Sequence, residues 1–559
     1  MKNLFKSQIT KLLCILAVVA ISTFGVAQIY KQFNHDLIQT ETKGLENVLF
    51  AKNVRSQYSE EETHLCIHDK VLEKEEEMFE SKRQYFEEEV EESFQSNDTT
   101  ISFQGNLQEG DGWKPIRIHF DYSNLMDSDA DVKNFITKEL IPAAGDFFKE
   151  FLRVKPLKNP LKIDPYYSVN TCGLAEIKIP KDHINQGIQD ADIVFYIKAV
   201  NNEKENFLAY ASNCPQRHRY QLGSNRPVMG YFAMNLFYLT KHIRDKDPMR
   251  KAQWIFTTIH EMTHSLVFSP SHFKKFVDGP LSTIKQGGQT FVSHSKIKKL
   301  TQQHFNCQDA EGAPLENEGG QGTAGAHWER KVFGNELMTG SSMYDSVMSS
   351  FTASMFEISG WYTVNQEKVG TLTWGKQQGC GIFKSQCNIN QFCPSQKQVG
   401  CSYDYSSIGA CQDDPLSDKC FFYLPYSNAH CNYPAESIAK MIDKLGGATG
   451  QKSRCWKTDL LNKKVHKKID AFCFESKCSY ENANSPTASF KFEGSWYDCK
   501  QGQDQVKVKS GYIFTCPDTF AFCYSQSACP DSCFGRGVCV KGVCQCTADF
   551  TGSNCSQVK

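Results

Sequence analysis

Cysteine content limits what this chain can fold into more than any other feature of its sequence. The 559 residues include 24 cysteines, and 19 of these lie at or beyond Cys380. Cytosolic proteins rarely keep so many thiols, whereas secreted modules use disulfides where a hydrophobic core is too small to hold the chain. The sequence therefore predicts a disulfide framework formed in an oxidising compartment. The length also exceeds what one hydrophobic core supports, which predicts several domains.

The N-terminus also predicts secretion. Lys2, Lys6 and Lys11 precede an apolar run over residues 12–24, and small residues follow at 25–27. This order is typical of a signal peptide, here residues 1–27. The alternative is a signal anchor that stays in the membrane. No later segment is apolar enough to span a bilayer, so we expect a protein that is secreted, held in a secretory organelle or associated with the cell surface.

The stretch with the clearest chemistry is a His-Glu-x-x-His motif at residues 260–264. Residues four apart share one face of a helix, so His260 and His264 can direct two imidazoles at one metal ion. Glu261 lies beside them and can act as the general base of a zinc peptidase. Pro248 suits the first turn of such a helix, and apolar residues recur behind it at helical spacing. The alternatives are a chance match and an ordinary buried helix with two histidines.

A catalytic zinc site keeps three protein ligands and one open position, so a third ligand has to come from elsewhere. The common metzincin continuation x-x-Gly-x-x-His is missing, because Val267 replaces its glycine and Pro270 its histidine. A β-branched valine resists positive φ, so we expect the turn after the helix to be built differently. His272 is nearby but two residues out of register. His327 follows a Gly-rich run at 318–326, which either brings backbone close to a site or is a surface loop.

Residues 28–112 are expected to form a separate pro-segment, or more simply an acidic linker. They contain a glutamate-rich stretch over 73–92 and a glycosylation sequon at Asn97. With Cys66 and Cys14 of the signal set aside, an even 22 cysteines remain, which makes Cys66 the odd one. A thiolate on a pro-segment can bind an active-site zinc and keep the enzyme inactive. The alternative is that Cys66 pairs with another cysteine.

The rest of the chain divides into regions of different character. Residues 113–272 alternate strand-like and helical patterns up to the motif helix, which predicts an α+β domain with a disulfide between Cys172 and Cys214. Residues 273–378 form a central subdomain. Residues 379–525 hold thirteen cysteines, an even set with Cys307, and predict a Cys-rich domain of mostly irregular or β structure. Residues 526–559 resemble an EGF-like module, which serves either as a rigid terminal spacer or in adhesion.

These motifs together resemble leishmanolysin, a family of metzincin zinc peptidases in which a long insertion separates the motif helix from the third histidine. The family's helix motif is matched over residues 260–268, with Val267 in place of a glycine. Its Gly/Ala-rich run is matched by residues 319–326 before His327. Its Glu-Leu-Met is matched at 336–338, and its pro-segment motif His-x-Cys-Ile-His-Asp at 64–69.

The resemblance implies a metzincin-type α+β catalytic domain and a secreted zinc endopeptidase, made as a zymogen, that hydrolyses proteins or peptides. It implies one catalytic Zn²⁺. It assigns roles to six residues: the zinc ligands His260, His264 and His327, the general base Glu261, the Met-turn residue Met338 and the zymogen switch Cys66.

Two alternatives of a different class stay open. The first is an adhesion or binding protein on a retained peptidase fold, whose Cys-rich and EGF-like modules bind a protein partner. The second is a secreted, disulfide-rich structural protein with a chance motif. Catalysis is favoured because the base Glu261 and all three histidines are intact. The formal net charge of −1 gives no indication of a nucleic-acid partner.

Overall fold

The computed structural model describes residues 66–80 and 107–559, apart from short gaps at 126–127, 218–219, 245–247, 321–322, 342, 385–386, 388, 390, 395–397, 435 and 463–466. The predicted signal peptide, most of the predicted pro-segment and the Asn97 sequon lie outside the described residues. Within the described ranges, no helix has both the length and the apolar character needed to cross a membrane. The domain boundaries given above stay predictions.

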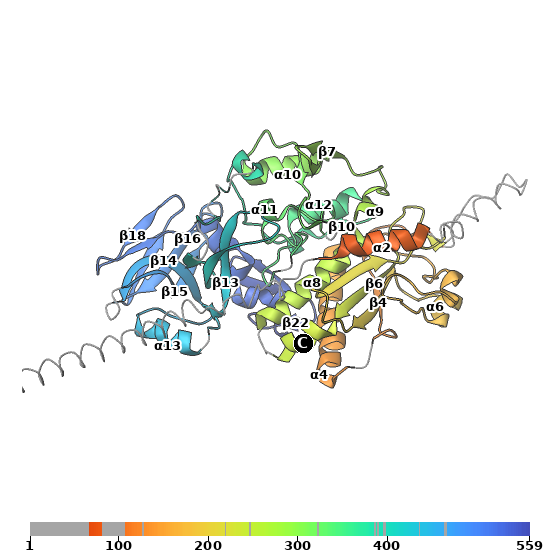
Figure 1. Ribbon diagram of the computed structural model, residues 1–559, viewed down its shortest axis with the longest axis horizontal. Coiled ribbons are helices and arrows are strands. Elements are labelled where there is room, and N and C mark those ends of the chain that lie inside the picture. The colour runs from red at the N-terminus through yellow and green to blue at the C-terminus, as the bar shows by residue number, and fades with distance from the viewer. Residues whose placement is uncertain are drawn as a thin grey trace, which may run out of the picture.

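The N-terminal part combines helices with a four-stranded sheet, in agreement with the predicted α+β class (Figure 1). The sheet has the order β2-β4-β6-β5, in which β2, β4 and β6 are parallel and β5 is an antiparallel edge strand. A continuous helical stretch of α4, η2 and α5 provides the crossover that the parallel strands β2 and β4 need. The elements are α2 (His68–Glu80), β1 (Lys114–Pro115), β2 (Ile118–Asp121), α4 (Ala130–Asn134), η2 (Phe135–Leu140), α5 (Ile141–Phe151), β3 (Leu152–Val154), η3 (Pro165–Ser168), α6 (Lys181–Asn185), β4 (Ile193–Val200), β5 (Ala209–Asn213), β6 (Met229–Asn235), α7 (Leu236–Arg244) and α8 (Pro248–Leu266).

The two faces of this sheet pack into different cores. Phe195 of β4 and Phe232 of β6 lie in a large core that also buries α5 and α8. Tyr196 and Tyr231, next to them in the sequence, point to the opposite face because side chains alternate along a strand. That second core includes Val71 of α2, so the described piece of the predicted pro-segment packs on the sheet.

Helix α8 begins at Pro248, as predicted, and ends at Leu266. The chain then turns without a positive φ: the N–H groups of Val267 and Phe268 both donate to the Thr263 carbonyl, at 2.9 and 3.0 Å. The short helix α9 (Pro270–Phe273) follows at once. The turn is therefore built differently from a glycine turn, as the β-branched Val267 requires.

The Cys-rich part is more regular than the sequence predicts. It contains a three-stranded sheet, β11-β12-β13, and a six-stranded antiparallel sheet, β17-β16-β15-β14-β19-β18. Aromatic side chains on neighbouring strands, such as Trp456, Phe474 and Phe490, fill a core of their own. Aromatic residues favour strands, and the irregular cysteine spacing hides this pattern in the sequence. The elements are β11 (Val399–Cys401), β12 (Ser407–Asp413), β13 (Phe421–His430), α13 (Glu436–Lys444), β14 (Ser453–Asn462), β15 (Lys467–Ser479), β16 (Thr487–Phe492), β17 (Ser495–Cys499), β18 (Gln505–Lys507), β19 (Ile513–Thr515) and α14 (Thr519–Tyr524).

The central region between α9 and β11 consists of small elements that enclose the segment with His327. Phe305 of α10 and Phe351 of α12 belong to the same large core as α8. The elements are β7 (Thr283–Gln286), β8 (Gln289–Val292), α10 (Ser295–Phe305), β9 (Ala313–Pro314), α11 (Arg330–Phe333), α12 (Ser350–Ile358), β10 (Thr363–Val364), η6 (Gln366–Lys368) and η7 (Cys380–Phe383).

Eleven disulfides join the 22 cysteines from Cys172 to Cys555. The predicted pair Cys172–Cys214 is confirmed. Cys307 bonds to Cys380, and the remaining cysteines up to residue 523 pair among themselves, as expected. So many disulfides indicate an extracellular or secretory environment.

The C-terminal module packs against the back of the motif helix. It comprises η8 (Gln526–Ala528), η9 (Pro530–Gly535), β20 (Gly537–Val540), β21 (Val543–Cys546), β22 (Phe550–Thr551) and β23 (Gln557–Val558), and its six cysteines pair first with third, second with fourth and fifth with sixth. Gly535 lies so close to α8 that a Cβ there would be 3.2 Å from the Ala252 oxygen. The buried guanidinium of Arg536 lies 2.8 Å from the Glu139 carboxylate of η2. Figure 1 shows this end of the chain beside α8.

Candidate active site

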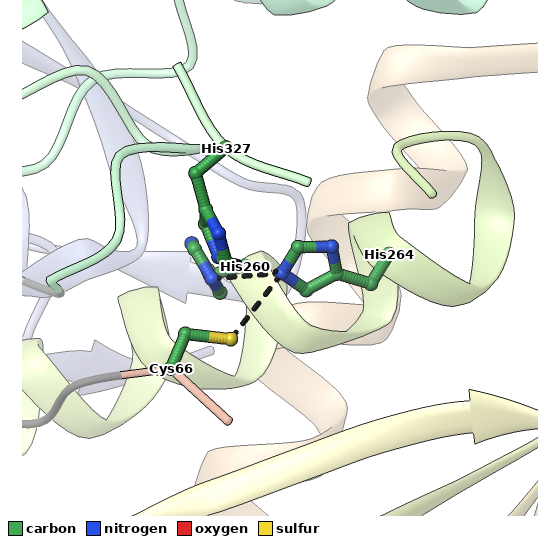
Figure 2. Close-up of side chains that lie close together, drawn as sticks. All are labelled: Cys66, His260, His264 and His327. Atoms are coloured by element: carbon green, nitrogen blue, oxygen red, sulfur yellow. Dashed lines mark hydrogen bonds between the residues drawn. The ribbon is translucent and has the colours of Figure 1, made fainter. Parts of the chain in front are cut away.

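Three histidine rings and one thiol meet beside the C-terminal half of α8 (Figure 2). His260 and His264 lie one turn apart on α8, and His327 comes from the segment just before α11. The Nε2 atom of His264 lies 3.1 Å from Nε2 of His260 and 3.1 Å from Nε2 of His327. The Cys66 Sγ lies 3.4 Å from the same atom. All four residues are buried, and their four ligand atoms lie within 4.8 Å of one another.

A backbone carbonyl orients each histidine ring. A carbonyl oxygen only accepts hydrogen bonds, so Nδ1 carries the proton and, in the neutral ring, Nε2 keeps its lone pair. Three lone pairs therefore face one point. The pairs of Nδ1 and carbonyl oxygen are His260 with Leu337 at 2.6 Å, His264 with Phe268 at 2.7 Å and His327 with Thr323 at 2.9 Å.

This donor set fits a tetrahedral metal ion. Bare imidazole nitrogens 3.1 Å apart repel each other in a buried site unless a cation lies between them. Burial lowers the pKa of His264 well below its usual value, which keeps the ring neutral and able to bind a metal. Metal–nitrogen bonds of about 2.0–2.1 Å place neighbouring tetrahedral ligands about 3.3 Å apart, close to the separations seen here. Three histidines and one cysteine are ligands that zinc accepts.

Glu261 points into the same buried space. Its Oε2 accepts from the Ala211 N–H of the edge strand β5 at 3.1 Å, and its Oε1 accepts from the Cys66 thiol at 3.4 Å. Burial raises the pKa of Glu261 to about 7, although the neighbouring His260 ring and the two hydrogen bonds oppose this rise. A carboxylate with such a pKa can take up and return a proton near neutral pH.

Met338 lies in a buried turn that connects two of the histidines. The carbonyl before it accepts from His260, and its own carbonyl accepts from the N–H of Trp328, the neighbour of His327, at 2.9 Å. The Met338 N–H donates to Oε2 of the buried Glu336 at 2.6 Å. The turn therefore fixes where the third histidine lies relative to α8.

Cys66 enters the site at the start of the described part of the predicted pro-segment. Two residues further on, the His68 ring stacks on His264, with ring centroids 4.0 Å apart and planes 5° apart. The Nδ1 atom of His68 lies 3.0 Å from the carbonyl oxygen of Ala211. The segment thus covers the histidine cluster with a thiol and a ring, and holds onto the edge strand beside it.

A second set of contacts holds this segment on the sheet. It is made by Glu75 of α2, whose role the sequence did not indicate. The Glu75 carboxylate accepts from the Tyr231 hydroxyl at 2.5 Å, from Ser212 Oγ at 2.6 Å and from the Leu174 N–H at 2.9 Å. Burial raises the pKa of Glu75 despite these three hydrogen bonds. The only available signal was the i, i+4 spacing of Val71 and Glu75, which places the acid on the apolar face of its helix.

The structure brings together most of the predicted site residues: Cys66, His260, Glu261, His264 and His327, with Met338 in the adjoining turn. It does not bring in His272. The Nε2 atom of His272 lies 3.0 Å from Asn213 Oδ1 and 3.1 Å from the Ser265 carbonyl. The amide of Ala211 and the three orienting carbonyls were also missed, because backbone groups leave no trace in a sequence.

Comparison with known proteins gives a consistent result. A family model described as leishmanolysin matches residues 128–416. A leishmanolysin-like peptidase of Caenorhabditis elegans is 25% identical over 523 residues, covering 72% of this chain and 74% of that protein. A ciliated left-right organizer metallopeptidase of Danio rerio is 29% identical over 370 residues, 62% of this chain and 57% of that one. A leishmanolysin homolog of Crithidia fasciculata is 28% identical over 309 residues, 53% and 44%. The chain thus spans about three quarters of the first relative and about half of the others.

Proposed function

This chain belongs to the leishmanolysin family of metallopeptidases, and from this premise we propose that it is a secreted, zinc-dependent endopeptidase made in a latent form. The observation that carries the proposal is the convergence of three buried Nε2 atoms beside the Glu261 carboxylate. On this proposal the catalytic unit is of the metzincin type, with Met338 in its Met-turn. A peptidase of this family acts on proteins or peptides.

His260, His264 and His327 would hold the zinc ion. When bound, zinc supplies Lewis acidity, which lowers the pKa of water and polarises a carbonyl group. Glu261 faces the same space through Oε1, so it is placed to take a proton from water and to pass it to the leaving amine. The Ala211 N–H holds the other carboxylate oxygen and so fixes the direction of Oε1.

Cys66 accounts for latency. Its sulfur lies 3.4 Å from both His264 Nε2 and Glu261 Oε1, so it fills the space between the ligands and the base. Water and a substrate carbonyl need this same space. Three histidines and a thiolate would complete a four-coordinate zinc site with no open position. Removal of the segment that carries Cys66 would therefore open the site and release Glu261 together.

The same segment also occupies a surface on which an extended substrate can bind. Strand β5 is an edge strand, and its Ala211 carbonyl is taken by His68 in the latent form. Extended peptides bind exposed strand edges through main-chain hydrogen bonds. Without the segment, the Ala211 carbonyl could accept a hydrogen bond from a substrate main-chain N–H. The bound segment would therefore block substrate binding as well as the reaction.

The adhesion alternative gains no support from the described residues. The disulfide pairing of the C-terminal module is compatible with an EGF-like module, but one face of it is buried against α8. Cysteines of this module belong to the same hydrophobic core as α8, which indicates a structural role for the module. We propose that it supports the motif helix.

The test is hydrolysis of an unfolded protein such as casein by the full chain after removal of the Cys66 segment. We expect activity that a zinc chelator abolishes and that Zn²⁺ restores. Glu261→Ala should keep its zinc and lose roughly 10²–10⁴-fold in kcat, the usual contribution of a general base. Glu203→Ala, at an exposed position outside the removed segment, serves as the matched control. Zinc-loaded protein without activity, or full activity in Glu261→Ala, would contradict the proposal.

A further inference from the structure

A second cluster of metal-binding side chains lies on the other side of the sheet. His119 and Asp121 come from β2, and His183 comes from α6. One ligand atom from each lies within 4.8 Å of the others. In the register of the sheet, His119 is paired with Val194 and Asp121 with Tyr196. These partners face the second core, whereas α8 packs on the opposite face, so the cluster is separate from the candidate active site.

The two ring nitrogens of His183 have different neighbours. Nδ1 of His183 lies 3.0 Å from the Tyr196 hydroxyl, and Nε2 lies 3.9 Å from Oδ2 of Asp121. The latter distance is too long for a hydrogen bond, so Nε2 is free to present its lone pair to a cation when Nδ1 carries the proton and donates to Tyr196. A histidine ligand held by a hydrogen bond from its other nitrogen is the usual arrangement in metal sites.

Asp121 and His119 each bring one ligand atom to within 4.8 Å of the others. Oδ1 of Asp121 accepts from the Ser123 N–H at 3.1 Å, which orients the carboxylate and leaves Oδ2 toward His183. The His119 ring meets the His183 ring edge to face, with centroids 5.4 Å apart. Among the described residues, neither ring nitrogen of His119 has a hydrogen bond.

We propose that His119, Asp121 and His183 bind a second divalent transition-metal ion, Zn²⁺ in the oxidising environment that the disulfides indicate. Two imidazoles and one carboxylate are a donor set that this class of ion prefers, and they exclude neither water nor a further ligand from the remaining positions. The ligands of such an ion lie about 3.3 Å apart. The 3.9 Å between His183 and Asp121 therefore has to shorten by roughly half an ångström, and the separations from His119, which are at most 4.8 Å, by up to about 1.5 Å through side-chain rotation.

The role of this ion would be structural. Helix α6 lies in the long connection between β3 and β4, and β2 is the outer strand of the sheet. An ion held by His183 on one side and by His119 and Asp121 on the other ties this connection to the edge of the sheet. It takes no part in the proposed reaction, and its presence does not depend on that proposal.

The test counts zinc atoms per chain in the full-length protein, after equilibration with Zn²⁺ and removal of loose metal by gel filtration. We expect two zinc atoms per wild-type chain and one in the double variant His119→Gln/His183→Gln. The control His294→Gln alters a partly exposed histidine outside both clusters and should keep two. One zinc atom in the wild type, or two in the double variant, would overturn the proposal.

A titration of the metal-free wild type with Co²⁺ gives the same answer without a variant. We expect two equivalents to bind, of which only one develops the thiolate-to-cobalt absorption band that the Cys66 site produces. The other should show only the weak bands of a nitrogen and oxygen site. Saturation at one equivalent that carries the thiolate band overturns the second site. Two equivalents without the thiolate band leave the second site intact and count against Cys66 instead.

Discussion

The contacts of Glu75 offer the sharpest test of how the segment that carries Cys66 is held on the sheet. In Glu75→Ala three hydrogen bonds to a carboxylate disappear, each worth about 1.5–3 kcal/mol before the cost of burying the charge. The raised pKa of Glu75 shows that this cost is substantial. The buried Tyr231 hydroxyl is also left without its acceptor, at about 1–3 kcal/mol. We expect the segment to dock more weakly by about 2–3 kcal/mol, or roughly 30- to 150-fold.

Alkylation of Cys66 by iodoacetamide in the uncleaved chain measures this change. The thiol is buried while the segment is docked, so the alkylation rate reports how often the segment opens. We expect the rate to rise by the same roughly 30- to 150-fold in Glu75→Ala. Glu77→Ala, two residues away on the exposed face, should leave the rate unchanged. Equal rates in the wild type and Glu75→Ala would refute the reasoning, because the contacts of Glu75 would then contribute nothing to docking.

Three further predictions concern pH, the third ligand and the C-terminal module. Because docking raises the pKa of Glu75 above its free value, the protonated form favours docking below the free pKa, and this support is lost as the pH rises through the docked pKa. The ratio of Cys66 alkylation in the wild type to that in Glu75→Gln should therefore increase with pH; a flat ratio would exclude Glu75 as the titrating group. His327→Ala should lose both the catalytic zinc and casein hydrolysis, whereas His272→Ala should keep both, and the reverse pattern in metal analysis would reassign the ligand. Arg536→Ala removes a buried guanidinium from the Glu139 carboxylate and from the Phe550 ring, 4.4 Å away. It should lower the free energy of unfolding by about 1–3 kcal/mol in a denaturant titration, and an unchanged midpoint would show that this contact of the module with η2 does not stabilise the fold.

The spacing of residues along the chain predicted those parts of the site that depend on the geometry of a single helix or turn. His260 and His264 share a helix face because they are four residues apart, and Pro248 marks where that helix begins. Val267 correctly indicated an altered turn, because backbone sterics act within a few residues. His327 is 63 residues from His264 in the sequence, so only the family resemblance distinguished it from other histidines.

What the sequence could not predict depends on contacts between distant segments. The Ala211 amide that holds Glu261 belongs to a strand 50 residues away and contributes no side chain. Glu75 is one of many acids in its stretch, and only the packing of α2 on the sheet selects it. The C-terminal module was expected to be a spacer or an adhesion module. Its contact with α8 depends on Gly535 meeting a helix that lies almost 300 residues earlier in the sequence.

Zinc K-edge X-ray absorption of the full-length chain, before and after removal of the Cys66 segment, tests the central claim most directly. The latent form should show three nitrogen scatterers at about 2.0–2.1 Å and one sulfur at about 2.3 Å. After removal of the segment, oxygen should replace the sulfur while the three nitrogens stay. The second proposed site contributes only nitrogen and oxygen, so the spectra are recorded in His119→Gln/His183→Gln. A latent spectrum without sulfur, or one with fewer than three nitrogens, would contradict the proposed active site.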